Sequence, residues 1–132
     1  MKFRERTLST GSKVLLGRDS KNNDELVKSF KGKKNVILHT AAPGSPFCVI
    51  ETKDGGRPSK KEIEEAGAIC ARYSQDWRDH KHDIAMHVFT GHDVKKRFWM
   101  KQGSWNIKNS KTINIKKAKI KEIERHLKDN QK

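Results

Sequence analysis

The chain has 132 residues, of which 33% are hydrophobic and 35% are charged, a balance that suits one small domain with a modest core. Thirty Lys and Arg against sixteen Asp and Glu leave a formal net charge of +14. The excess is uneven, because thirteen of the basic residues and only three of the acidic ones lie in 95–132. This charge favours a polyanionic partner, with nucleic acid ahead of membrane lipid.

Two classes of protein are excluded by the apolar pattern. No run approaches the roughly 20 apolar residues that a membrane span needs. The first ten residues contain no apolar stretch of the kind that a secretory signal requires. Cys48 and Cys70 have no metal-ligand spacing and fall in apolar patterns, which is typical of buried thiols in a reducing compartment. We therefore expect a cytoplasmic protein without membrane contact.

The first half of the chain alternates strands with one short helix. Residues 3–17 predict an opening β-hairpin, and residues 20–30 predict an amphipathic helix that ends at a glycine. Strands are expected at about 35–40 and 46–52, followed by a flexible turn at 53–58.

The second half begins with the strongest helix signal. Ser59 and Glu62 form a capping box, and apolar residues then follow a 3.6-residue period for about four turns, as far as Trp77. A strand is expected at 84–89. Residues 105–107 and 112–115 alternate as a second hairpin.

A basic helix over about 117–128 is expected to close the chain. The fold is then α+β: one domain of residues 1–132, its core at about 3–117, with a mixed or mostly antiparallel sheet of six or seven strands packed by two helices.

Two polar clusters follow two apolar runs in the first half. Gly17-Arg18-Asp19 ends the run at 14–16, while His39 and the loop Pro43-Gly44-Ser45 end the run at 36–38. If both strands run parallel with the helix crossing between them, both clusters reach the same edge of the sheet. Such edges commonly bind ligands.

These residues resemble the NFACT-R family. The resemblance lies in four blocks in the right order, covering about residues 3 to 117: Gly17-Arg18-Asp19-Ser20 with Asn23-Asp24, His39 with Pro43-Gly44-Ser45, Glu65-Ala66-Gly67 with Tyr73-Ser74, and Val94-Lys95-Lys96 with Gly103. It implies an RNA-binding domain of ribosome-associated quality-control factors, here as a stand-alone member. The implied partners are rRNA or tRNA, the large ribosomal subunit and ribosome-associated proteins.

The sequence also departs from the family pattern. The further domains of the long members are missing, which weakens any expectation of tRNA selection or nascent-chain tailing. Pro46 stands where many relatives have a histidine, and residues 97–101 replace a loop rich in Pro, Gly and Lys.

The candidate RNA-binding residues combine donors, cations and an aromatic ring: Arg18, His39, Pro43, Gly44, Ser45, Lys95, Lys96, Arg97, Trp99 and Lys101. Arg18 could bind a phosphate through its planar fork, or could form a salt bridge to Asp24 or Asp19. His39 could contact a nucleotide or serve as a hydrogen-bonded structural residue.

The cations at 95–97 are interleaved with aromatic residues, a pattern that single-stranded RNA binding uses, although charge runs are often only solvated surface. Trp105, in a predicted strand, is more typical of the core, and we expect Trp99 to be the exposed ring.

Enzymatic interpretations are weaker. His80 and His82, with His87 and His92, match no standard metal spacing. Ser45 lacks the strained turn of a hydrolase nucleophile. We expect no catalysis, cofactor or metal. The alternative to RNA binding is a protein-interaction adaptor whose basic face docks on an acidic partner in a ribosome-associated complex.

Overall fold

The computed structural model describes residues 2–96, 100–102 and 104–130, the last four of these by their backbone only. The elements in chain order are β1 (Arg4–Thr7), β2 (Lys13–Leu16), α1 (Ser20–Phe30), β3 (Val36–Thr40), β4 (Cys48–Glu51), α2 (Lys60–Arg72), α3 (Gln75–His80), β5 (Ile84–Thr90), the 3₁₀ turn η1 (Gly91–Asp93), β6 (Val94–Lys95), β7 (Asn106–Ile107), β8 (Lys111–Ile115) and α4 (Lys117–Asn130). The α+β class is thereby confirmed.

The main sheet has six strands in the order β1-β2-β4-β3-β5-β8, and every neighbouring pair is antiparallel. Both β2 and β3 are antiparallel to β4, which lies between them. The two strands therefore run in the same direction, as expected, with α1 crossing from one to the other. The carboxyl ends of β2 and β3 therefore lie at the same edge of the sheet, which is the border formed by strand ends and not by an outermost strand.

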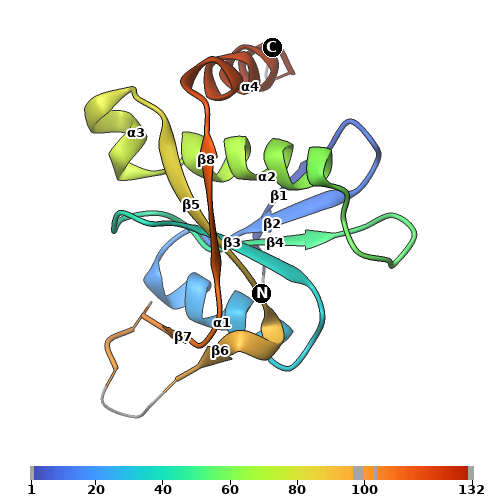
Figure 1. Ribbon diagram of the computed structural model, residues 1–132, viewed down its shortest axis with the longest axis vertical. Helices are drawn as coiled ribbons and strands as arrows, with labels where there is room; N and C mark the ends of the chain where they lie inside the picture. Colours follow the sequence, from blue (N-terminus) through green and yellow to red (C-terminus); the bar gives the residue numbers. More distant parts are fainter. Residues whose placement is uncertain (1, 97–99, 103, 131–132) are drawn as a thin grey trace.

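Helices cover both faces of this sheet (Figure 1). One apolar cluster lies between the sheet and α2, and it includes Leu38, Met86 and Trp77. The other lies on the α1 side, where Leu26 and Phe30 meet Phe89. Residues of β2, β3, β4 and β5 face the two clusters in alternation, as the two-residue period of a strand requires.

The C-terminal helix forms a further layer outside α2. Ile120 and Ile123 of α4 are buried in the cluster on the α2 side. In Figure 1, α4 lies beyond α2, and α1 lies on the opposite side of the sheet. On α2 itself, Gly67 allows this helix to pack closely against β8, because a Cβ at Gly67 would come within 2.7 Å of Ile115 Cδ1.

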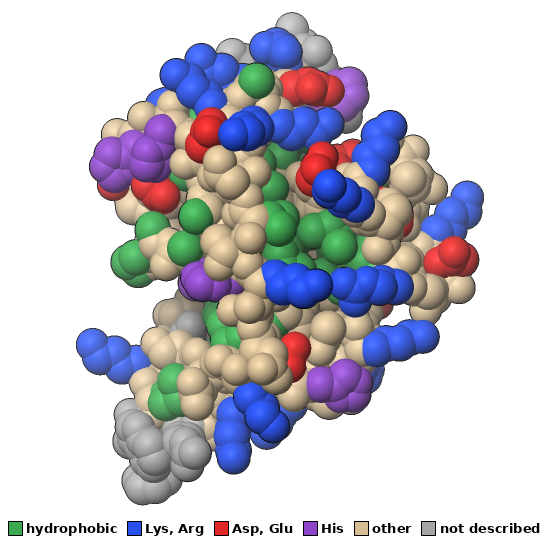
Figure 2. Space-filling view, in the orientation of Figure 1, with side chains coloured by type: hydrophobic (Ala, Val, Ile, Leu, Met, Phe, Trp, Pro, Cys, Tyr) green, Lys and Arg blue, Asp and Glu red, His purple; other side chains and the backbone are tan. Residues whose placement is uncertain are grey.

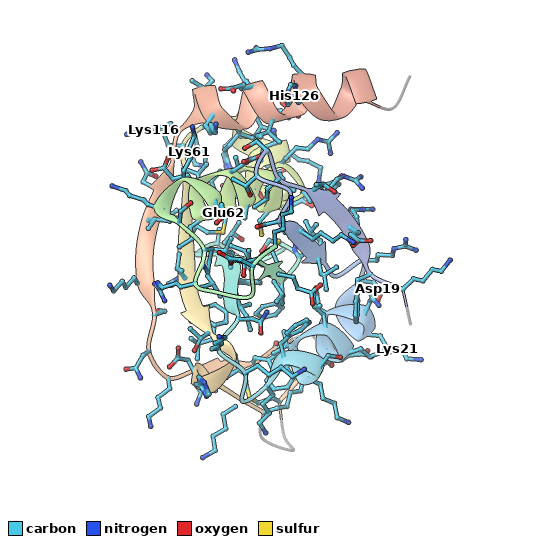
Figure 3. All side chains as sticks on the ribbon, turned by 90° about the vertical axis from the view of Figure 1, so that its right-hand side faces the viewer. Asp19, Lys21, Lys61, Glu62, Lys116 and His126 are labelled. Atoms are coloured by element: carbon cyan, nitrogen blue, oxygen red, sulfur yellow. The ribbon has the colours of Figure 1, made fainter. Side chains whose placement is uncertain are left out.

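The predicted helix caps are confirmed. The Ser59 hydroxyl accepts from the Glu62 amide at 3.1 Å, and Glu62 accepts in return from the Ser59 amide at 3.0 Å. Glu62, labelled in Figure 3, also accepts from the hydroxyls of Thr10 and Ser12, each at 2.6 Å. These bonds lower the pKa of Glu62 to about 2. The capping box therefore also ties the β1–β2 turn to α2.

Two predictions about the second half were wrong. The expected four-turn helix ends early, because Tyr73 terminates α2 and the Ser74 hydroxyl caps a separate α3 by accepting from the Trp77 amide. The expected hairpin at 105–115 does not form either. Strand β7 pairs with β6 in a small second sheet, whereas β8 pairs with β5 at the edge of the main sheet. Alternation marked both strands but could not identify their partners.

Among the described residues, every helix is too short or too polar to cross a lipid bilayer. Cys48 and Cys70 are buried free thiols, as predicted. Burial and the neighbouring Cys70 raise the pKa of the Cys48 thiol well above its ordinary value. The two cysteines are therefore part of the core.

Candidate nucleic-acid interface

A cavity of about 860 Å³ lies where five parts of the chain meet at the edge of the sheet. These parts are the start of β1, the β2–α1 turn, the β3–β4 loop, the α2–α3 corner and the segment leading into β7. The lining residues are Arg4, Gly17, Arg18, Asp19, Ser20, Asn23, His39, Pro43, Gly44, Ser45, Pro46, Phe47, Tyr73, Gln75, Arg78, Gln102, Ser104, Trp105 and Ile107. Both polar clusters expected at this edge are present.

Gly17 allows the first wall of the cavity to form. A Cβ at Gly17 would come within 1.8 Å of Asn23 Oδ1. That oxygen accepts from the Phe47 amide at 3.0 Å, and the Gly17 amide donates to the Phe47 carbonyl at 3.1 Å. A glycine is therefore required here for close approach, and the β2–α1 turn and the β3–β4 loop are joined through one buried asparagine.

The Pro43-Gly44-Ser45 loop is joined to α3 in a similar way. Gly44 has a φ of +89°, which residues with a side chain rarely adopt, and a Cβ at Gly44 would lie 2.9 Å from Gln75 Cβ. The Gln75 amide donates to the Gly44 carbonyl at 2.8 Å. The Ser45 hydroxyl donates to the Pro46 carbonyl and accepts from the Thr40 amide. The loop is therefore fixed by the elements on either side of it.

Three arginines give the cavity its charge. Arg4, Arg18 and Arg78 line it, and Asp19 is the one carboxylate among the described lining residues. The Asp19 side chain caps α1 by accepting from the Asn22 amide at 2.8 Å. Arg18 is exposed and makes no ion pair with any described residue. The salt bridge considered for Arg18 is therefore not seen, and its guanidinium remains available.

Tyr73 organises further guanidinium groups at one side of the cavity. The Cζ atoms of Arg4, Arg72 and Arg6 lie 4.3, 4.9 and 5.8 Å from the ring centroid. Arg6 also donates to the Tyr73 hydroxyl at 2.7 Å. Cation–π contacts hold these groups near one another despite their mutual repulsion. The Tyr73 side chain thus concentrates positive charge beside the cavity.

His39 lies in the cavity as a neutral ring. It stacks on Phe47 with a centroid separation of 4.3 Å and an interplanar angle of 28°. Burial lowers the pKa of His39 to about 4, and the nearby His87 contributes in the same direction. The imidazole is therefore uncharged near pH 7. It can offer a hydrogen bond or a ring face to a ligand, but not a positive charge.

Lys96 is engaged in a contact within the protein. Its Nζ lies 2.9 Å from Asp24 Oδ1, donates to the Lys101 carbonyl at 3.0 Å and lies 5.2 Å from the Trp105 ring centroid. Trp105 Nε1 donates to the same Asp24 oxygen at 3.0 Å. Asp24 therefore holds the half-buried Trp105 against the cavity, with Lys96 as the counter-ion.

The structure brings together five of the predicted binding residues. Arg18, His39 and the three residues of the 43–45 loop all line the cavity. The described lysines of the prediction do not: Lys95 is exposed on β6, Lys96 pairs with Asp24 and Lys101 is exposed just before β7. Arg97 and Trp99 lie outside the described residues.

Arg4, Tyr73 and Arg78 line the cavity but were not among the predicted binding residues, whereas Trp105 had been considered both as an aromatic platform and as a core residue. Tyr73 belongs to one of the four blocks of the resemblance, which was a usable signal. The two arginines had no local signal, since they come from a strand and a helix distant from the glycine turns.

Basic side chains are not confined to the cavity. Figure 2 shows Lys and Arg along the top, right and bottom of one face, and further basic side chains cross its middle beside apolar ones. The exposed lysines of α4 belong to the layer outside α2, away from α1 (Figure 1). The cavity therefore differs from the rest of the surface in its fixed arrangement of arginines, amides and rings.

Comparison with known proteins gives related results for sequence and structure. A solved structure of the C-terminal part of the fibronectin/fibrinogen-binding protein from Streptococcus suis has the same fold, with a TM-score of 0.78 and 22% identity over 92% of this chain and 49% of that one. The archaeal Rqc2 homolog aRqcH of Methanocaldococcus jannaschii is 28% identical over 72 residues, or 54% of this chain and 11% of the relative. The ribosome quality control complex subunit NEMF homolog of Drosophila melanogaster is 30% identical over 64 residues, or 48% of this chain and 6% of the relative.

The matched segments are thus a small part of those long relatives. The family assignment rests on a broader match, because a sequence model of the NFACT protein RNA binding domain matches residues 2–109. This range includes all the residues that line the cavity. The chain belongs to the NFACT protein RNA binding domain family.

Proposed function

We propose that this protein is a non-catalytic RNA-binding module that acts on rRNA or tRNA in the cytoplasm, in ribosome-associated quality control. The Drosophila relative is named as a ribosome quality control complex subunit, and the family is described as RNA-binding. The observation that carries the proposal is the cavity lined by Arg4, Arg18 and Arg78.

Phosphate binding would depend on Arg18. Its exposed guanidinium has no ion-pair partner among the described residues, and a planar fork matches two phosphate oxygens. The amides of Gly44 and Ser45 donate no hydrogen bond to any described group, so they could act as further donors to a ligand. A phosphate in the cavity would then meet donors from two loops that are held together by backbone contacts.

Base contacts would depend on the rings. Trp105 is half-buried, and Asp24 fixes its orientation. Stacking of one base on such a ring contributes about 1–3 kcal/mol and tolerates any sequence. The neutral His39 would add a hydrogen bond or a ring edge rather than charge. This arrangement suits an unpaired nucleotide more than a continuous duplex.

Fluorescence anisotropy with a short single-stranded RNA tests the proposal, with tRNA and rRNA fragments as competitors. Arg18→Ala should weaken binding about tenfold or more, because a charge-assisted hydrogen bond contributes about 1.5–3 kcal/mol. It should also reduce the slope of log K against log salt by about 0.7, the value for one phosphate contact with a single strand.

Lys60→Ala is the matched control, since Lys60 is an exposed cation on α2 outside the cavity. It should change affinity much less than Arg18→Ala. Equal losses would show that Arg18 acts only through general charge. Binding that hardly responds to salt would instead support the adaptor hypothesis, in which an acidic protein is the partner.

A further inference from the structure

The end of α3 gathers two histidines and one carboxylate that the RNA-binding proposal does not use. His80 Nδ1 lies 2.9 Å from Asp76 Oδ1, and His82 Nε2 lies 2.9 Å from the same oxygen. The two imidazole rings are 4.9 Å apart between centroids, with an interplanar angle of 34°. One ligand atom from each residue falls within 4.8 Å of the others.

The backbone brings His82 back onto α3. Lys81 ends the helix in the left-handed region, with φ 51° and ψ 45°. It is the one non-glycine residue with positive φ in the described part of the chain. Glycine or asparagine usually occupies such a position, because other residues are strained there. Backbone strain of this kind is more frequent at functional sites than elsewhere.

We propose that Asp76, His80 and His82 form a binding site for a divalent ion of the zinc class. Imidazole nitrogen with one carboxylate oxygen is a donor set that Zn²⁺ accepts, at about 2.0–2.2 Å from each ligand. Two donors on a tetrahedral ion of that size are about 3.4 Å apart. The two 2.9 Å contacts to Asp76 Oδ1 therefore need to lengthen by about half an ångström. Mg²⁺ and Ca²⁺ prefer sites made of oxygen alone and should bind poorly.

The local charge favours a cation at this position, in contrast to the rest of this basic protein. Between Gln75 and Asp83 there are three carboxylates and two cations. In Figure 2, His side chains over α3 form one group next to Asp or Glu side chains. Asp76 is 16% exposed in its side chain, whereas His80 and His82 are 60% and 52% exposed. The carboxylate thus forms the floor of the site, and the imidazoles stay accessible to an ion from solvent.

The ordinary alternative is that the two histidines only hydrogen-bond to Asp76 at the end of a short helix. It predicts the same contacts without metal, so metal binding itself must be measured. Other side chains should not compete for the ion. Both cysteines are buried, and the remaining histidines do not converge with acidic groups in the described chain.

The test is titration of the untagged protein with Zn²⁺ in competition with a chromophoric zinc indicator. We expect one zinc per chain, and NMR signals from the rings of His80 and His82 should shift on addition. His82→Gln and Asp76→Asn should each weaken zinc binding by at least about tenfold. His126→Gln is the control, because His126 is an exposed histidine on α4 (Figure 3).

Failure of the wild-type protein to bind zinc would overturn the proposal, and so would unchanged affinity in both His82→Gln and Asp76→Asn. A saturating excess of Mg²⁺ should not displace the zinc, and displacement would also refute the assignment. The wild-type titration decides the matter even if a variant folds poorly. None of these measurements uses RNA, so their outcome is separate from that of the RNA-binding proposal.

Discussion

Acid should destabilise this protein through His39, beginning below about pH 6.5. The native pKa of His39 is about 4, against an ordinary value of 6.5, because burial against Phe47 disfavours the imidazolium. Between these two values the unfolded chain binds a proton that the native protein does not. Stability therefore falls as pH decreases from about 6.5 toward 4, and it is unaffected by this group above 6.5.

The size of the effect follows from the two pKa values. Each unit of difference corresponds to about 1.4 kcal/mol, and most of the interval lies between neutral pH and pH 4.5. The free energy of unfolding should thus decrease by about 2–3 kcal/mol between about pH 7.5 and pH 4.5. This is a large part of the stability of a small domain, which is typically about 5–15 kcal/mol.

Urea unfolding of the wild-type protein and of His39→Gln at the two pH values measures the effect. Glutamine cannot be protonated, so the variant should lose much less stability on acidification. His92→Gln is the control, because His92 is an exposed histidine that also lines no part of the cavity. The reasoning is refuted if wild type and His39→Gln show the same dependence on pH.

Two further predictions concern the supports of the cavity and of α2. Gly17→Ala should destabilise the protein by about 1–3 kcal/mol in urea unfolding, because the added methyl would overlap Asn23. Gly56→Ala is the control and should change stability little, because its Cβ would make an ordinary 3.4 Å contact with Asp54 Oδ1. Equal effects of the two substitutions would contradict the close approach at Gly17. Glu62→Gln should cost about 1.5–3 kcal/mol at pH 7, since two hydroxyl groups lose a charged acceptor. This difference in the free energy of unfolding should shrink as pH falls from 4.5 toward 2, because the wild-type carboxylate then becomes protonated. Glu64→Gln is the control, since Glu64 is exposed, and it should hardly change stability. A difference that is independent of pH would argue against the charged acceptor.

The sequence predicted local structure well where the signal was itself local. The capping box at Ser59 formed as expected, because it uses side chains within three residues of the amides they satisfy. The common direction of β2 and β3 followed from a short helical connection. The Gly17 and Pro43–Ser45 clusters met at the sheet edge for the same reason.

Long-range pairing was beyond the same reasoning. Residues 105–107 and 111–115 both alternate, but nothing near them specifies that β7 pairs with β6 and β8 with β5. The break between α2 and α3 was also hidden, because Trp77 continues the apolar period of α2 while being buried from a different helix. Periodicity records which residues are buried, not the element against which they pack.

The cavity shows why counting cations does not locate a binding site. Charge density along the chain pointed to Lys95 and Lys96, yet Lys96 is neutralised by Asp24 in the folded protein. Arg4 and Arg78, which lie outside that run of cations, line the cavity with Arg18. A cation attracts phosphate to the extent that its charge is not already compensated, and compensation is a property of the fold. The positive field of the cavity therefore depends on the contacts that hold three distant arginines at one edge of the sheet. Substitutions at Gly17 or Gly44 that shift those loops should weaken RNA binding without removing a single charge.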